Sequence, residues 1–183
     1  MSSDLICEAG ALRLRRGSLA DVASIAGRLR PNDRLDIRLL SDAAPADAIA
    51  ACVRATLDVF TVEADGEPVA IGGVQRSRLR PAASVMWLIG STGLDMAFRR
   101  GGLRLSRAWF DRLRAGHGDV YNLVPESNVA DLRWLAWLGF APVRRWPDFR
   151  GTGIDCVEML CPAGPDQLSR NDLQSEPVSG SIR

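Results

Sequence analysis

Alternating or continuous apolar positions predict strands in the first half of the chain. Residues 12–15 alternate apolar and basic side chains, which is typical of a strand with one solvated face. The apolar runs at residues 59–63 and 69–74 flank the Asp-Gly pair at residues 65–66. Because that pair tolerates the positive φ of a tight two-residue turn, the two runs predict a hairpin. The run at residues 84–89 predicts a central strand that is buried on both faces.

Apolar positions at helical spacing predict helices between these strands. Ser18, followed three residues later by Asp21, predicts a capped helix start. A second helix is expected near Pro45, a residue suited to a first turn. The inner face of that helix is predicted to hold Ile49, Cys52, Val53 and Leu57. Residues 31–44 indicate only a short buried piece, helical or irregular.

The second half of the chain continues the alternation of helices and strands. Residues 99–114 predict a long helix, and residues 119–124 a further strand. Asn128 is a suitable cap for a helix that stops at Gly139. Two more strands, at residues 141–145 and 154–160, can form a closing pair.

The resulting order of elements is β-α-α-β-β-β-α-β-α-β-β. It predicts a single α/β domain with a mixed central sheet of about six to seven strands and helices on both faces. We expect an N-terminal extension at residues 1–10, the domain at 11–161, and a flexible polar tail at 162–183 that is rich in Gly, Pro, Ser and Asn.

Composition narrows the class of protein. The chain is 46% hydrophobic and 25% charged, as ordinary globular proteins are, and its apolar runs are far too short to cross a bilayer. No basic segment followed by an apolar run opens the chain, so a cytoplasmic location is expected. All 23 basic residues are arginine, which a GC-rich genome explains better than phosphate recognition does. A net charge of +1 gives no electrostatic signature of nucleic-acid binding.

The cysteine and histidine pattern argues against a metal site. The four cysteines contain no CxxC pair, and zinc sites usually draw their Cys and His ligands in close pairs. The single histidine, His117, lies in the turn-like segment Ala-Gly-His-Gly-Asp at residues 115–119. We therefore expect no metal, and no Cys/His or Ser/His nucleophilic centre.

Two motifs stand out in the sequence. Asn128 is followed eleven and twelve residues later by Gly139 and Phe140, which resembles the C-terminal signature of the GNAT N-acetyltransferases. The segments at 85–91, 121–124 and 132–140, with their Trp-Leu-Ile-Gly, Tyr-Asn and Arg-Trp-Leu-Ala-Trp-Leu-Gly-Phe runs, resemble the acetyltransferase-like proteins of short-tailed bacteriophages. The resemblance covers roughly residues 11–160.

The resemblance implies a site for acyl-CoA at the start of a helix. GNAT enzymes hold the pyrophosphate on backbone N–H groups in a segment that reads R/Q-x-x-G-x-G/A. The corresponding residues here are Arg99, Arg100, Gly101, Gly102, Leu103 and Arg104. Arg104 stands where a small residue is expected: it either reaches the phosphate or fills its place. Asn128 would position the pantetheine or the substrate.

The resemblance also implies an acid for the leaving thiolate and a base for the amine. The acidic tyrosine of the family falls at Leu135, which cannot donate a proton. The candidate catalytic residues are Tyr121, the chain's one tyrosine, and Glu126, just beyond the end of a strand, which we prefer as the base to Glu63 near the Asp65-Gly66 turn.

Two functions follow from this resemblance. The first is a phage-encoded N-acyltransferase with a degenerate site, using acetyl-CoA and an unknown amine acceptor. The alternative is an inert GNAT-fold protein of virion structure or assembly, whose partners are phage structural proteins. Neither function predicts a nucleic-acid or membrane partner, and the location would be the host cytoplasm or the virion.

Overall fold

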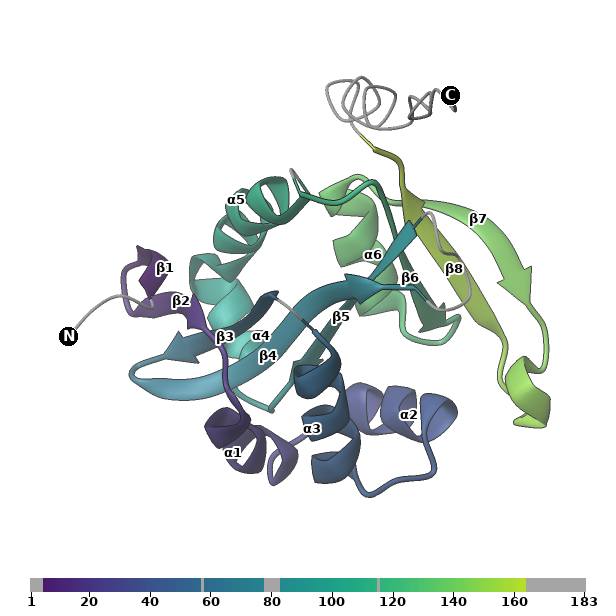
Figure 1. The fold of residues 1–183 in the computed structure, drawn as a ribbon, viewed down its shortest axis with the longest axis horizontal. Coiled ribbons are helices and arrows are strands. Elements are labelled where there is room, and N and C mark those ends of the chain that lie inside the picture. Colours follow the sequence, from purple (N-terminus) through teal and green to yellow (C-terminus); the bar gives the residue numbers. More distant parts are fainter. Residues whose placement is uncertain (1–4, 57, 78–82, 115, 164–183) are drawn as a thin grey trace, which may run out of the picture.

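Eight strands form one mixed sheet in the computed structural model, which describes residues 5–56, 58–77, 83–114 and 116–163 (Figure 1). The strand order is β1-β2-β3-β4-β5-β6-β8-β7, and among these neighbours only β5 and β6 pair in parallel. The strands are β1 (Leu5–Ala9), β2 (Leu12–Arg16), β3 (Asp58–Ala64), β4 (Glu67–Arg76), β5 (Ala83–Gly90), β6 (Asp119–Pro125), β7 (Ala141–Trp146) and β8 (Cys156–Cys161).

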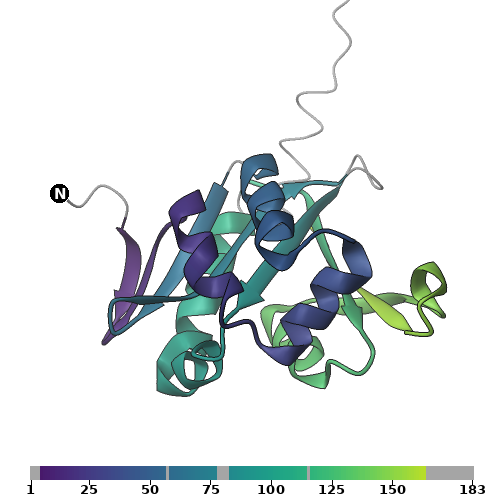
Figure 2. The same ribbon diagram turned by 90° about the horizontal axis from the view of Figure 1, so that it is seen from below.

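Helices cover both faces of the sheet (Figures 1 and 2). On one face lie η1 (Leu19–Asp21), α1 (Val22–Ala26), α2 (Pro31–Leu40) and α3 (Pro45–Ala55). On the other lie α4 (Leu94–Ala97), η2 (Phe98–Gly102), α5 (Leu103–Arg114) and α6 (Val129–Leu138). Each layer encloses its own core, because successive strand residues point to opposite faces. Phe60 and Met86 belong to the core under α5 and α6, whereas Val59 and Ile71 belong to the core under α1 to α3.

The turn and the helix caps confirm the local predictions. Asp65 and Gly66 join β3 to β4 with φ of 53° and 83°. The Asp21 carboxylate accepts the Ser18 N–H at 3.0 Å in a capping box. Gly139 ends α6 in the left-handed region, with φ of 100°. On α3, Ile49 and Val53 are buried as predicted and Cys52 is half-buried, while Leu57 lies outside the described residues.

The sheet has one strand more than the six to seven predicted. The additional strand is β1, which falls within the predicted N-terminal extension and pairs antiparallel with β2. It escaped prediction because four of its five residues are exposed, so its sequence carries no alternation of buried and exposed side chains. The predicted tail lies almost wholly outside the described residues; within it, the Ala163 N–H donates to Asp119 Oδ1 at 2.9 Å.

Two helical segments differ from the expectation. The uncertain stretch at residues 31–44 contains α2, which opens with Pro31 at its first position. The first residues of the helix expected at 99–114 belong instead to η2, a π-type turn that follows α4. Within η2, Gly101 has φ of 109°. A glycine is required at this kink because side-chain-bearing residues rarely adopt that backbone conformation. The regular helix, α5, therefore begins at Leu103.

None of the helices in the described ranges is both long enough and apolar enough to span a membrane.

Candidate active site

The parallel strands β5 and β6 separate part-way along their length. Within the described residues they pair at three positions, which end at Val85 opposite Tyr121. Beyond Val85, β5 continues to Gly90 without β6 as a neighbour, while β6 stays paired with β8 from Val120 to Pro125. Strand edges that part leave backbone groups that need other partners. The opening between these strands is therefore the natural place for a ligand in this sheet.

A buried ion pair supports the far end of β5. Arg30, at the start of α2, forms two hydrogen bonds with the fully buried carboxylate of Asp33. Asp33 Oδ1 also accepts the Gly90 N–H at 2.9 Å, and the Arg30 N–H donates to the Gly90 carbonyl at 3.1 Å. The N–H and the carbonyl of Gly90 thus bond to Asp33 on α2 and to Arg30 just before it, and not to strand β6.

Asn128 connects the two faces of the opening. Its Oδ1 accepts the Asn32 side-chain amide at 2.9 Å and the Asp131 N–H at 3.3 Å. Its Nδ2 donates to Asp131 Oδ2 at 2.9 Å, and Asp131 lies 3.7 Å from Arg30. Asn128, predicted to position the pantetheine or the substrate, is 2% exposed and engaged in these bonds.

Asp36 is the carboxylate in this cluster with the most unusual environment. It lies one helical turn beyond Asp33 on α2, and its Oδ1 is buried with no hydrogen-bond partner among the described residues. The pKa of Asp36 is raised to about 7, chiefly by burial and then by the negative charges of Asp131 and Asp33, while the positive charge of Arg30 acts in the opposite direction. The pKa of the Cys156 thiol at the start of β8 is also raised. Burial is the largest cause, and the negative charge of Asp36 is the next. A carboxyl group of this kind can exchange a proton near neutral pH.

The two predicted catalytic residues lie apart from each other. Tyr121 is 9% exposed, and its hydroxyl is 2.7 Å from Ser77 Oγ, on the paired part of β6. Glu126 is exposed beyond the end of β6 and accepts two hydrogen bonds from Arg145, at 3.1 and 2.7 Å. Leu135, at the position of the family tyrosine, is fully buried in the core under α5 and α6.

The predicted phosphate-binding residues surround the kink at the start of α5. Arg99 and Arg104 are exposed, and neither forms a hydrogen bond or an ion pair within the described part of the chain, whereas Arg100 donates to Asp65 Oδ2 at 2.8 Å. A Cβ at Gly101 would meet no other atom within 4 Å. A Cβ at Gly102 would lie 2.8 Å from the Ala97 carbonyl oxygen, so that position is closed to larger residues. Leu103, the first residue of α5, is 42% exposed.

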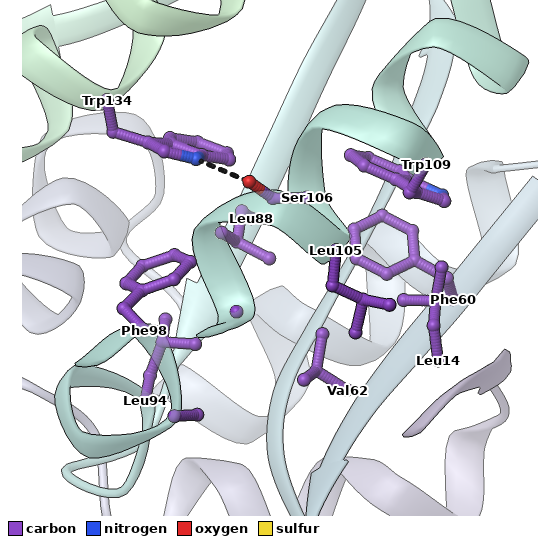
Figure 3. A pocket seen from close by; sticks show the side chains of 12 residues that line it. Leu14, Phe60, Val62, Leu88, Leu94, Phe98, Leu105, Ser106, Trp109 and Trp134 are labelled. Carbon is purple, nitrogen blue, oxygen red and sulfur yellow. Dashed lines mark hydrogen bonds between the residues drawn. The ribbon is translucent and has the colours of Figure 1, made fainter. Parts of the chain in front are cut away.

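A small apolar pocket, partly open to solvent, lies beneath this kink (Figure 3). The walls come from β2, β3, β5, α4, η2, α5 and α6, and are formed by Leu14, Phe60, Val62, Leu88, Leu94, Ala97, Phe98, Gly102, Leu105, Ser106, Trp109 and Trp134. The Trp134 indole N–H donates to Ser106 Oγ at 3.2 Å and so joins α6 to α5 across one end of the pocket. Leu88 comes from the part of β5 that β6 no longer pairs, so the pocket borders the opening.

Comparison with known proteins identifies the architecture. No protein-family model matches the chain, and no curated protein sequence is significantly similar to it. Among solved structures, Ard1 from Thermoplasma volcanium superposes with a TM-score of 0.64 at 16% identity, over 84% of this chain and 99% of that one. yncA from Salmonella typhimurium, solved with acetyl-CoA as its cofactor, gives 0.62 at 17% identity, over 85% and 95%. The chain has the GNAT fold.

A third similar structure is the ribosomal-protein-S18-alanine N-acetyltransferase from Escherichia coli, with a TM-score of 0.58 at 15% identity over 93% of this chain and 99% of that one. Identities this low show a shared fold and nothing finer. The fold predicted from the Asn128 to Phe140 spacing is confirmed. None of the three structures named comes from a bacteriophage, so the resemblance to phage proteins stays a prediction.

Asp36 and the buried pair of Arg30 and Asp33 belong to this site, and the sequence pattern singles out none of them. The apolar spacing of residues 31–44 is weak and predicts no clear secondary structure. The available signal was the Pro31 start together with two aspartates three residues apart, because that spacing places Asp33 and Asp36 on one side of a helix.

Proposed function

We propose that this protein is an acyl-CoA-dependent N-acyltransferase, for which acetyl-CoA is the simplest donor. The observation that carries the proposal is the opening between β5 and β6, which has an apolar pocket and a glycine kink on one face and a partly buried carboxylate on the other. Two substrates can approach such an opening from opposite faces and meet at its centre. The acetyl-CoA that accompanies yncA supports the choice of donor.

The donor is assigned to the face of α5. The pyrophosphate would lie over Gly101, Gly102 and Leu103, where glycines allow phosphate to approach backbone N–H groups. Arg99 and Arg104 flank these residues as unpaired cations in the described structure, and Arg100 is within reach once it leaves Asp65. Asn128 would act through the Asn32 and Asp131 side chains that it holds, rather than by touching the donor.

The acceptor is assigned to the face of α2. An amine entering beside Asp36 would attack the thioester carbonyl carbon while the Asp36 carboxylate takes the amine proton. The carbon–sulfur bond then breaks, and CoA leaves as the thiolate, so that one amide, one thiolate and one protonated carboxyl are formed. A base whose pKa is about 7 suits this step, since half of it is ionised at neutral pH.

Asp36 is preferred to the two catalytic residues expected from the sequence because of its bonding. Glu126 would first have to leave Arg145, and Tyr121 would have to leave Ser77. Asp36 Oδ1 has no such bond to break within the described residues. The acid that would protonate the thiolate has no counterpart at Leu135, and a thiolate can take its proton from water.

The test combines binding with turnover. Acetyl-CoA should bind in calorimetric titration, and CoA release should be measurable with a thiol reagent over a panel of peptide N-termini, polyamines and free amino acids. Asp36→Asn should keep the binding and lower turnover at least about 100-fold, as loss of a general base does. Asp42→Asn removes the same charge from an exposed position and should leave both unchanged. Binding without release for every acceptor, or full turnover by Asp36→Asn, would contradict the assignment.

A second candidate function rests on the fully buried Leu135 and on the aromatic C-terminal part of the chain. Trp137 is 44% exposed and Val143 is 49% exposed, and each offers an apolar side chain to another protein. Together with the sequence resemblance, this supports an inert GNAT-fold protein in a phage particle. Failure of acetyl-CoA to bind at millimolar concentration, with recovery of the protein in purified particles, would favour this function over catalysis.

A further inference from the structure

We propose that Asp131 is a positioning residue for Asp36, an inference that deepens the proposed acyltransferase function and rests on it. Asp131 lies on α6 and Asp36 on α2, so the two carboxylates come from helices on opposite faces of the sheet (Figure 1). Asp131 binds the guanidinium of Arg30, which would otherwise be free to pair with Asp36. Asp36 is thereby left without a cation and can take the proton of an acceptor amine.

The guanidinium of Arg30 is surrounded by carboxylates other than that of Asp36. Its Nε and Nη2 both donate to Asp33, and the distance from Nη2 to Oδ1 is 3.2 Å. Its Nη1 donates to Asp95 Oδ1 at 3.4 Å, and its Nη2 lies 3.7 Å from Asp131 Oδ1. Because Arg30 is 8% exposed, these carboxylates replace water around its charge. Each nitrogen that could reach a further carboxylate is therefore already engaged.

The position of Asp131 is fixed by the first turn of its own helix. Asn128 Nδ2 donates to Asp131 Oδ2 at 2.9 Å, and the Asp131 N–H donates to Asn128 Oδ1 at 3.3 Å. Asn128 is 2% exposed, and its Oδ1 also accepts the Asn32 side-chain amide at 2.9 Å. Asp131 therefore presents its other oxygen, Oδ1, to Arg30, and it cannot turn away without losing the bond from Asn128.

The Asp36 carboxylate has the complementary surroundings. Its Oδ1 is buried and accepts no hydrogen bond within the described residues, although Arg30 caps the same helix. Burial is the largest cause of the raised pKa of Asp36; the charges of Asp131 and Asp33 add to it, and the charge of Arg30 opposes it. Arg30 is thus close enough to act on Asp36, and the two remain unpaired because the nitrogens of Arg30 are bonded elsewhere.

Asp131 acts on Asp36 in two ways that have the same sign. Its own negative charge disfavours the ionised form of Asp36, and its contact with Arg30 withholds a cation from Asp36. An ion pair between Arg30 and Asp36 would make the carboxylate a weaker base, because a neighbouring cation stabilises the ionised form. A weaker base accepts the amine proton less readily at neutral pH. Asp131 therefore supports the base from the opposite helix without touching the substrate.

The test follows the titration of Asp36 itself. Carbon-13 NMR of the aspartate carboxyl groups, with the Asp36 signal assigned by its loss in Asp36→Asn, gives the titration midpoint whether or not the protein is active. The midpoint should lie at about 7 in the unmodified protein. It should fall to about 6 or below in Asp131→Asn, since a neighbouring cation lowers a carboxyl pKa by about 1–3. Asp131→Glu keeps the charge and should return the midpoint toward that of the unmodified protein.

Two further variants control for charge and for folding. Asp111→Asn also removes a carboxylate that pairs with an arginine, 3.2 Å from Arg107, and it should leave the Asp36 midpoint unchanged. Asp95→Asn removes the partner of Arg30 whose side chain is 67% exposed, and it should lower the midpoint by less than Asp131→Asn does. Because Asp95 is exposed, this variant tests the inference even if thermal unfolding shows that Asp131→Asn is not folded.

The outcomes separate this inference from the proposed function. An unchanged midpoint in Asp131→Asn, or in Asp95→Asn if only that variant folds, would overturn the inference and leave the acyltransferase proposal intact. An equal fall in Asp111→Asn would also overturn it, because the shift would not depend on Arg30. The pH at which kcat/KM for CoA release rises should fall together with the NMR midpoint. Absence of CoA release from the unmodified protein would overturn the proposed function, whereas the NMR midpoints decide whether Asp131 controls the titration of Asp36.

Discussion

Asp36→Asn should make the protein more stable, and the gain should appear only as the pH rises. In the folded chain the pKa of Asp36 is raised to about 7, chiefly by burial, from an ordinary value of 3.8. Between these two values the unfolded chain has released the Asp36 proton while the folded chain retains it. Unfolding therefore releases a proton, and the stability of the unmodified protein falls as the pH rises from about 4 to about 7. Above about 7 both states are ionised and the loss is complete.

The magnitude follows from the two pKa values. The difference between about 7 and 3.8 corresponds to at most about 4 kcal/mol of lost stability. Asparagine has the same shape and cannot ionise, so it avoids this loss. Rearrangement and water around the carboxylate reduce the gain, and we expect about 2 kcal/mol at pH 8. For a domain of this size that corresponds to an increase of about 4–8 °C in the midpoint of thermal unfolding.

The assay is thermal unfolding, followed by circular dichroism, at pH values from 4.5 to 8.5. Asp36→Asn should differ little from the unmodified protein at pH 4.5 and should be clearly more stable at pH 8. Asp42→Asn, which changes an exposed aspartate, should show no such pH-dependent difference. If Asp36→Asn is less stable than the unmodified protein at pH 8, the carboxylate has a stabilising partner, and both the raised pKa and its use as a base are refuted.

Three further predictions concern the core and the donor site. Trp134→Ala should lower the free energy of unfolding, measured in urea, by about 3–5 kcal/mol, because Trp134 is 8% exposed. Trp137→Ala on the same helix should lower it by less than about 1 kcal/mol, because Trp137 is 44% exposed. Similar losses for both variants would contradict the orientation of α6. Asp33→Ala should lower the free energy of unfolding by about 3–5 kcal/mol, because it leaves the buried Arg30 guanidinium without its main partner. A loss below about 1 kcal/mol in urea unfolding would mean that Arg30 finds another partner. Arg104→Gly should weaken acetyl-CoA binding, measured by calorimetry, at least about tenfold, as the loss of a charged hydrogen bond does. Tighter binding by this variant would show that the Arg104 side chain obstructs the phosphate.

Most of the sheet and the helix ends could be predicted from the sequence because each depends on local chemistry. The Asp65-Gly66 turn needs residues that tolerate positive φ, and Gly139 ends α6 for the same reason. Asn128 supplies the side-chain oxygen that caps α6. Such signals involve only residues that are neighbours in the sequence.

The candidate site could not be predicted in the same way because its residues come from distant parts of the chain. The inner side of α2 includes Asp33, which is fully buried only because Arg30 and the Gly90 N–H satisfy its carboxylate. A helix whose buried positions include a charged residue does not show the apolar spacing used to recognise helices. The raised pKa of Asp36 likewise depends on burial and on Asp131, which lies on α6.

The short β5–β6 pairing joins two antiparallel ladders within the sheet, which we expect to open separately. Strands β1 to β5 form one antiparallel ladder and β6 to β8 another, and in the described ranges three residue pairs join them. Amide hydrogens within each ladder should exchange together, and those at the joint should exchange earlier, since fewer bonds must break there. The hydrogen bond from Asn32 to Asn128 and the ion pair between Arg30 and Asp131 would then hold the two ladders in place relative to each other. We expect that, without these two contacts, the ladders could rotate relative to each other about the β5–β6 pairing while each ladder stays folded.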